Sequence, residues 1–247
     1  MKLLALLGLM LAVTALSIVM VRADERPAPG KQVPQRLDRD GETIHYLLFL
    51  PKDYENSEKE RKWPLMLFLH GAGERGDGNL ELVKVHGPPK IVETKPDFPF
   101  LLVSPQCPEG EGWDAATLQA LLDHVESQFP VDRDRVCVTG LSMGGYGTWA
   151  LLAAQPRRFA AAVPICGGGN VADAEKLKEV PVRVYHGDQD RAVPVARSRE
   201  MVEALKQAGG KVEYTEYQNI GHDSWTQTYA DEKLYEWLLK QTRKTSE

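Results

Sequence analysis

Apolar and polar residues alternate along this chain in blocks that predict strands and helices in turn. Short apolar runs predict strands at residues 44–50, 63–69, 98–103, 135–141, 159–166, 181–186 and 211–217. Longer stretches with apolar residues at helical spacing predict helices over residues 115–129, 143–155, 195–208 and 226–241. Strands that alternate with helices of this length are typical of βαβ units. The pattern therefore predicts a three-layer α/β fold, with a mostly parallel sheet flanked by helices.

The N-terminal residues have the pattern of a targeting signal. Lys2 precedes an apolar stretch over residues 3–21, and Val21-Arg22-Ala23 offers a small-residue cleavage position. We expect residues 1–23 to be a signal peptide. The stretch is also close to membrane-spanning length, so an uncleaved N-terminal anchor is the alternative. Both interpretations place the rest of the chain outside the cytoplasm, secreted or periplasmic, or membrane-anchored if the segment is not cleaved.

Composition narrows the function of the remaining chain. The 247 residues are 43% hydrophobic and 26% charged, which is typical of a globular protein, and the net charge of -5 argues against a nucleic-acid partner. The three cysteines have neither CxxC nor Cys/His ligand spacing, so no metal site is predicted. We expect residues 24–40 to form a polar leader and residues 41–247 to form a single domain.

A serine lies in a glycine-flanked turn between a predicted strand and a predicted helix. Gly140, Ser142 and Gly144 form the pattern G-x-S-x-G. Small residues suit a sharp strand-to-helix turn, and such a turn lifts the serine hydroxyl out of the sheet. A glycine-rich turn without chemistry is the alternative, but the strand before and the helix after are the context that a nucleophile elbow requires. We therefore expect Ser142 to be a nucleophile.

A serine nucleophile needs a base, and His222 follows the last predicted strand, where the chain order serine, acid, histidine requires it. The carboxyl ends of parallel strands share one edge of a sheet, so His222 and Ser142 are expected there together. Of the other histidines, His45 lies inside a predicted strand and His124 inside a predicted helix. His70 and His186 each precede a glycine and resemble turn residues. His222 is the predicted base.

The acid that orients the histidine should follow the penultimate predicted strand, where Asp188 and Asp190 lie. Its carboxylate would accept a hydrogen bond from the imidazole and stabilise the imidazolium. We expect Asp190 to be this acid, because it lies further out, where the chain can approach the loop of His222. Asp188 is expected to cap nearby backbone N–H groups in the turn. Asp223 is the weakest candidate, because adjacent side chains in an extended loop point apart.

An oxyanion hole is predicted in the glycine-rich loop after the strand at residues 63–69. Leu69-His70-Gly71-Ala72-Gly73 can turn backbone N–H groups toward the site. Such holes pair the amide after the nucleophile, here that of Met143, with one from this early loop, and we expect the second to be that of Ala72. A merely flexible glycine-rich loop is the alternative if the segment is taken alone.

Together these segments resemble the α/β-hydrolase superfamily, and within it a secreted serine esterase branch near the poly(3-hydroxybutyrate) depolymerases, feruloyl esterases and dienelactone hydrolases. The resemblance covers roughly residues 44–239 and rests on five motifs: residues 69–76, 104–108, 140–149, 186–190 and 221–225. In similar enzymes the second aspartate of His-Gly-x-x-Asp is the triad acid, which supports Asp190. The resemblance implies an α/β-hydrolase fold, ester hydrolysis through an acyl-enzyme, and no metal or organic cofactor.

The substrate pocket is less well determined by the sequence. Only 14 residues separate Cys166 from Pro181, too few for a large cap domain, so we expect an open site. Trp113 and Trp225 lie near predicted strand ends and are candidates for an aromatic pocket wall. Tryptophans that only seal the core are the alternative.

The sequence thus predicts an exported serine hydrolase that cleaves carboxylic esters. The expected substrate is a small-molecule or polysaccharide-linked ester, with no nucleic acid and no membrane beyond the possible N-terminal anchor. A prolyl-oligopeptidase-like peptidase is the nearest alternative, because it has the same triad and catalytic fold. A non-catalytic α/β-hydrolase relative that acts as a binding protein is the second.

Overall fold

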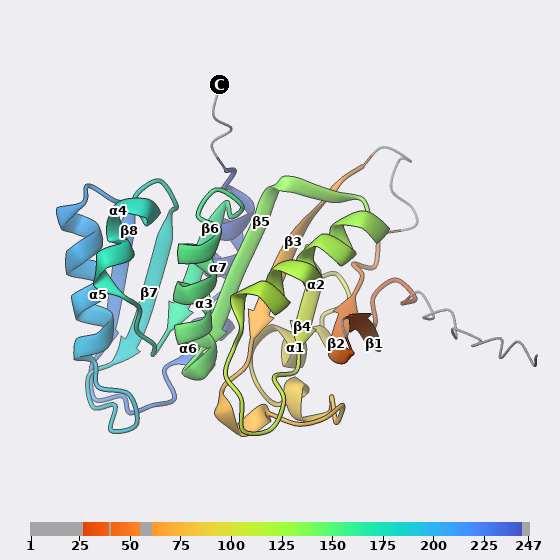
Figure 1. Ribbon diagram of the computed structural model, residues 1–247, viewed down its shortest axis with the longest axis horizontal. Coiled ribbons are helices and arrows are strands. Elements are labelled where there is room, and N and C mark those ends of the chain that lie inside the picture. Colours follow the sequence, from red (N-terminus) through yellow and green to blue (C-terminus); the bar gives the residue numbers. More distant parts are fainter. Residues whose placement is uncertain (1–26, 40, 55–60, 244–247) are drawn as a thin grey trace, which may run out of the picture.

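The computed structural model describes residues 27–39, 41–54 and 61–243, which form an eight-stranded sheet with helices on both faces (Figure 1). The strands are β1 (Gln32–Arg39), β2 (Glu42–Phe49), β3 (Trp63–Leu69), β4 (Leu101–Pro105), β5 (Val131–Leu141), β6 (Ala161–Ile165), β7 (Val182–Gly187) and β8 (Val212–Tyr217). The α-helices are α1 (Gly87–Val92), α2 (Ala115–Gln128), α3 (Met143–Ala154), α4 (Ala174–Leu177), α5 (Ala196–Gln207), α6 (Trp225–Ala230) and α7 (Glu232–Leu239). Short 3₁₀ helices are η1 (Ala72–Glu74), η2 (Leu82–Val85) and η3 (Val171–Asp173).

The sheet is mostly parallel, as the sequence predicts. Its strand order is β1-β2-β4-β3-β5-β6-β7-β8, and the six strands β3 to β8 run parallel to one another. β1 and β2 add an antiparallel edge. Leu69 at the end of β3 pairs with Gly140 of β5, and Leu141 pairs with Ile165 of β6. The carboxyl ends of these central strands therefore meet at one edge of the sheet.

Two hydrophobic layers hold the helices against the sheet. On one face, Leu65 and Leu67 of β3 belong to a hydrophobic cluster that also contains the apolar faces of α2, α3, α4 and α5. Met66 and Phe68 point to the other face and pack with α1, α6 and α7. Figure 1 shows α2, α3 and α5 in front of the sheet and α7 behind it. Side chains of a strand alternate between its faces, so each central strand is buried on both sides and needs apolar residues throughout.

The predicted polar leader is wrong for residues 32–39, because they form β1. All eight residues of this strand pair with β2 at the edge of the sheet. Only Gln35 among them is buried, and the other side chains are exposed or half-exposed. An edge strand that packs little on the core does not need apolar alternation, so its sequence resembles a leader.

The helix predicted over residues 226–241 is interrupted. α6 ends at Ala230 and α7 begins at Glu232, with Asp231 between them. The carboxylate of Asp231 accepts a hydrogen bond from the backbone N–H of Lys233 and so caps α7.

The predicted signal peptide or anchor, residues 1–23, lies outside the described residues. Within the described ranges, no helix is both long enough and apolar enough to cross a membrane.

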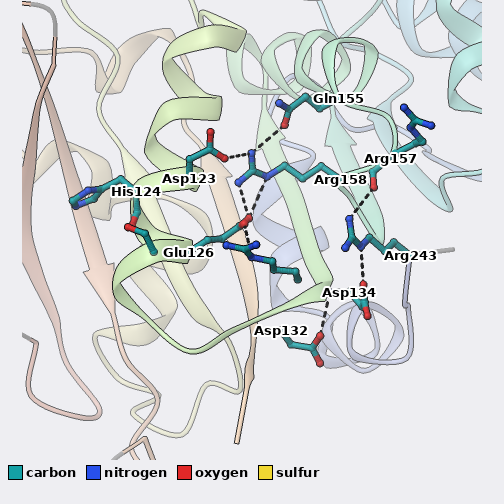
Figure 2. Close-up of polar contacts among 11 residues, drawn as sticks. Asp123, His124, Glu126, Asp132, Asp134, Gln155, Arg157, Arg158 and Arg243 are labelled. Atoms are coloured by element: carbon teal, nitrogen blue, oxygen red, sulfur yellow. Dashed lines mark hydrogen bonds and ion pairs between the residues drawn. The ribbon is translucent and has the colours of Figure 1, made fainter. Parts of the chain in front are cut away.

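A cluster of charged side chains ties the helices together at the edge of the sheet where β5 begins (Figure 2). The guanidinium group of Arg158, only 13% exposed, donates hydrogen bonds to Asp123 and Glu126 of α2. Arg243 donates to Asp134 of β5 and so fixes the chain after α7. This cluster lies at the end of α3 remote from Ser142, so it supports the fold and not the site.

Candidate active site

Ser142 lies on a sharp turn between β5 and α3. β5 ends at Leu141 and α3 begins at Met143, while Ser142 itself has φ 52° and ψ −115°. A non-glycine residue with positive φ is strained, and a nucleophile elbow stores strain of this kind. Close packing holds the turn in place, because a Cβ added to Gly144 would overlap the carbonyl oxygen of Leu69 on β3. The glycine of the motif is therefore required by the neighbouring strand.

Ser142, His222 and Asp190 form a continuous hydrogen-bonded chain. His222 Nε2 lies 2.9 Å from Ser142 Oγ, and His222 Nδ1 lies 2.7 Å from Asp190 Oδ2. A carboxylate only accepts hydrogen bonds, so Nδ1 carries the proton and Nε2 is free to accept the hydrogen bond of the serine hydroxyl. The His222 side chain is 28% exposed and that of Asp190 is fully buried. The structure thus brings together the three residues that the sequence singles out.

Asp190 is held by donors on both carboxylate oxygens. Oδ1 accepts from the backbone N–H groups of Ala192 and Val193, and Oδ2 lies within hydrogen-bond distance of His222 and His186. Burial raises the pKa of Asp190, but the hydrogen bonds from His222 and the two amides outweigh it, so the pKa lies below its ordinary value. Asp190 is therefore a fixed carboxylate anion beside the imidazole.

The other two candidate acids lie apart from the histidine. The prediction that Asp188 caps the turn is wrong, because the capping bonds are made by Asp190. Among the described residues, Oδ1 of Asp188 is buried and has no hydrogen-bond partner. Asp223 instead caps α6, accepting from the N–H and hydroxyl groups of Thr226. Both of its carboxylate oxygens are therefore engaged by Thr226.

The two predicted oxyanion amides belong to neighbouring loops at the carboxyl edge of the sheet. Met143 is the first residue of α3, and Ala72 is the exposed first residue of η1, directly after β3. β3 and β5 are paired, so both loops leave the sheet side by side. Glu74 Oε2 accepts from the N–H of Gly71 at 2.8 Å and closes the Ala72 loop on itself. An amide at the start of a helix points away from it, as an anion site requires.

His70 and His186 are buried structural groups. The prediction that His186 is a turn residue is wrong, because it lies within β7, whereas His70 directly follows β3. Both side chains are fully buried. His70 accepts a hydrogen bond from the N–H of Cys107 at Nε2, and its Nδ1–H donates to Gly71 O at 2.6 Å. Burial lowers the pKa of His70 to about 4, so it stays neutral and fixes the base of the oxyanion loop. The glycine that follows each histidine in the sequence gives no indication that the histidine side chain is buried.

The two candidate pocket tryptophans have different positions. Trp225 packs edge-on against His222, with ring centroids 5.2 Å apart, and also against His86 at 5.4 Å. Within the described part of the chain, Trp113 makes its ring contact with His70, and its indole N–H donates to His70 O. It lines a separate cavity of about 250 Å³ beside the start of α2. The sequence analysis did not identify His86, which directly follows η2 and contacts Trp225.

One group of described side chains has the composition of a metal site. The possible ligand atoms of Cys166, Asp190 and His222 lie within 4.8 Å of one another. Both ring nitrogens of His222 are already engaged, Nδ1 with Asp190 and Nε2 with the hydroxyl of Ser142. The geometry therefore favours a hydrogen-bonded acid–base pair over a metal centre.

The strand order, the elbow after β5 and the mostly parallel sheet define an α/β-hydrolase. Residues 109–236, more than half of the chain, match the sequence profile of the dienelactone hydrolase family. The chain belongs to this family, which confirms the resemblance drawn from its motifs.

Similar proteins include esterases. A solved thermostable esterase is 35% identical with a TM-score of 0.75, and the match covers 87% of this chain and 64% of that one. A bifunctional acetylxylan esterase/xylanase of Neocallimastix patriciarum is 27% identical over 70% of this chain and 27% of its own length. A probable feruloyl esterase C of Aspergillus terreus is 24% identical over 67% of this chain and 62% of its own. The chain therefore spans less than two thirds of each of these relatives.

Proposed function

We propose that the protein is an exported serine hydrolase that cleaves carboxylic esters through an acyl-enzyme. The observation that carries the proposal is the hydrogen-bonded chain from Ser142 Oγ through His222 to the buried Asp190. The esterases among its relatives support an ester as the substrate. Export is inferred from the N-terminal pattern of Lys2 and the apolar residues 3–21.

The chemistry follows from the direction of each hydrogen bond. Ser142 Oγ attacks the ester carbonyl carbon, and His222 Nε2 takes the hydroxyl proton. The N–H groups of Ala72 and Met143 donate to the oxyanion of the tetrahedral intermediate. His222 then gives its proton to the leaving alcohol, which departs and leaves an ester on Ser142. A water molecule, deprotonated by His222, releases the acid and restores the serine.

Asp190 acts through His222 in this mechanism. Its carboxylate holds Nδ1–H, so that Nε2 is the acceptor at the start of each half-reaction, and it stabilises the imidazolium formed in between. The fixed position of both carboxylate oxygens means that little reorganisation is needed when this charge develops.

The substrate is proposed to be a small-molecule or polysaccharide-linked ester. Between β6 and β7 the chain contains only η3 and the four-residue α4, which leaves no room for a large cap in this connection. An open edge accepts esters whose alcohol is part of a larger chain. Trp225 gives the wall beside His222 an aromatic surface that suits a planar or apolar group of the substrate.

Labelling of the serine tests the proposal directly. A fluorophosphonate should label wild-type protein at Ser142, and Ser142→Ala should fold normally, take no label and lose at least about 10³-fold in kcat on an aryl acetate. Label on another residue, or an alanine variant with full activity, would refute the mechanism. A peptide p-nitroanilide measured in parallel separates an esterase from a peptidase, and wild-type protein that neither hydrolyses nor is labelled would indicate a binding protein.

A further inference from the structure

The triad carboxylate is shared by two histidines. His186, at the end of β7, lies four positions before Asp190 and is fully buried. Its Nε2 is 3.1 Å from Asp190 Oδ2, the same oxygen that lies 2.7 Å from His222 Nδ1. Its Nδ1 is 2.7 Å from the hydroxyl of Ser198 on α5. Every polar atom of this ring therefore has a partner.

The partners of His186 determine which nitrogen carries its proton. Nε2 faces two groups that can only accept, Asp190 Oδ2 and the carbonyl oxygen of Val193 at 3.0 Å. A bare nitrogen lone pair against two acceptors would be repulsive, so Nε2 must be protonated. Burial lowers the pKa of His186, although Val193 and Asp190 act in the opposite direction. The ring is therefore neutral, with its single proton directed at the carboxylate.

We propose that His186 is a positioning residue of the proposed triad, whose Nε2–H fixes Asp190 Oδ2 where it accepts the proton-bearing Nδ1 of His222. The inference rests on the proposed function of Ser142, Asp190 and His222. The amides of Ala192 and Val193 hold only Oδ1, so the second oxygen needs a donor of its own.

His222 is a poor anchor for that second oxygen, because it comes from the loop after β8 and its side chain is 28% exposed. His186, by contrast, projects from the end of β7, which is paired on both sides, and has no solvent exposure. The buried histidine holds the carboxylate, and the carboxylate in turn orients the partly exposed His222, which carries out proton transfer.

The anchor continues into the scaffold beneath the nucleophile. The Ser198 hydroxyl shares its one proton between His186 Nδ1 and the carbonyl oxygen of Gly167 at 3.0 Å, and so joins His186 to the loop after β6. Gly167 packs against Gly145 in the first turn of α3, where an added Cβ at Gly145 would lie 3.1 Å from Gly167 Cα. A continuous series of contacts therefore connects Asp190 Oδ2 to α3, the helix that follows Ser142.

Two variants of His186 separate positioning from simple core packing. His186→Gln keeps an N–H donor near the place of Nε2, whereas His186→Leu removes the donor but keeps the volume. The leucine variant should lose roughly 10- to 100-fold in kcat on an aryl acetate with little change in KM, because a small displacement of Oδ2 misorients the base. The glutamine variant should recover most of this loss.

The pH profile is a readout that a packing role would not change. The ionisable groups facing His186 are Asp190, His222 and Glu216 of β8, whose carboxylate is held by Arg199 of α5. Without the Nε2–H donor, the charge of Asp190 is less compensated and stabilises the His222 imidazolium more strongly. The acid limb of kcat/KM should therefore move to higher pH in His186→Leu and stay in place in His186→Gln.

Ser198→Ala is the matched control, because it removes the partner of the other ring nitrogen and leaves Nε2 facing the same two acceptors. It should lower Tm, and it should shift the pH profile and reduce kcat less than His186→Leu does, because the Nε2–H donor is still present. If His186→Leu keeps wild-type kcat and pH profile, or if His186→Gln is no better than leucine, the positioning role is wrong.

A measurement on wild-type protein covers the case in which the leucine variant does not fold. ¹⁵N NMR of histidine-labelled protein should show His186 neutral with its proton on Nε2 above the ordinary histidine pKa of about 6.5, and a proton on Nδ1 alone would overturn the proposal. Fluorophosphonate labelling of wild-type Ser142 keeps the two proposals apart. Absent labelling contradicts the triad itself, whereas normal labelling with unaffected His186 variants contradicts only the positioning role.

Discussion

Replacement of Asp190 by asparagine should inactivate the enzyme and also destabilise it. The new amide keeps an oxygen for the N–H groups of Ala192 and Val193, but places an NH₂ donor where Oδ2 accepts from His222 and His186. The N–H groups of His222 and His186 would then face the NH₂ group of the asparagine, with no acceptor between them. His222 avoids this repulsion by changing to the tautomer with its proton on Nε2. In that form Nε2 can no longer accept the proton of Ser142. In a serine protease the equivalent change lowers kcat by about 10⁴, and we expect a loss of at least about 10²-fold here.

The stability change follows from the bonds lost. Hydrogen bonds to a charged group contribute about 1.5–3 kcal/mol each, so losing two should cost about 3 kcal/mol or more. For a chain of this size that lowers Tm by roughly 6–12 °C. The pKa of Asp190 is lowered in the folded state, so its contribution is present above the ordinary carboxylate pKa of about 4 and disappears as the pH falls through the folded value. The Tm difference between wild type and variant should therefore shrink in acid.

Asp188→Asn is the control for both measurements. Oδ1 of Asp188 is buried without a hydrogen-bond partner among the described residues, so removal of its charge loses no bond. We expect kcat close to wild type and a free energy of unfolding within about 0.5 kcal/mol. Activity on an aryl acetate and calorimetric Tm, measured for both variants, decide the matter. An inactive Asp188→Asn beside an Asp190→Asn that keeps kcat within tenfold would refute the assignment.

Two further predictions concern the elbow and the oxyanion loop. Gly144→Ala should lower the free energy of unfolding in urea by at least about 1–3 kcal/mol, because its Cβ would overlap the Leu69 carbonyl group. Gly73→Ala, whose Cβ meets nothing within 4 Å, should be neutral, and equal stabilities would contradict the packing argument. The pKa of His70 is lowered to about 4 by burial, so the unfolded chain takes up a proton first as the pH falls. Stability should drop by about 3 kcal/mol between about pH 6.5 and 4 in wild type but not in His70→Gln, and parallel pH curves would disprove this.

The central part of the fold could be predicted because burial on both faces leaves a strong signal. The apolar runs of β3, β5 and β6 read directly as strands, and the G-x-S-x-G pattern located the turn that joins β5 to α3. Chain order then placed an acid and a histidine at the same edge. These features depend on local sequence and on the rule that parallel strands end together, both of which a single sequence contains.

The errors arose where a contact distant in sequence decides the structure. β1 is held by pairing with β2, and its polar residues do not report this. The roles of Asp188 and Asp190 were divided in the prediction between capping and orientation, yet Asp190 combines them. One carboxylate oxygen closes the turn locally, and the other reaches His222, 32 positions away. Sequence spacing cannot show that a single side chain satisfies both.

The histidines show which physical property separates an acid–base group from a structural one. His70 and His186 are fully buried, and burial lowers the pKa of each, so both remain neutral donors with one fixed tautomer. His222 is partly exposed and lies between a serine hydroxyl and a buried carboxylate anion. A group that must gain and lose a proton in every cycle needs a partner that stabilises its charged form and a route to the substrate. Among these three, His222 alone has both, while the two buried rings hold the groups around it.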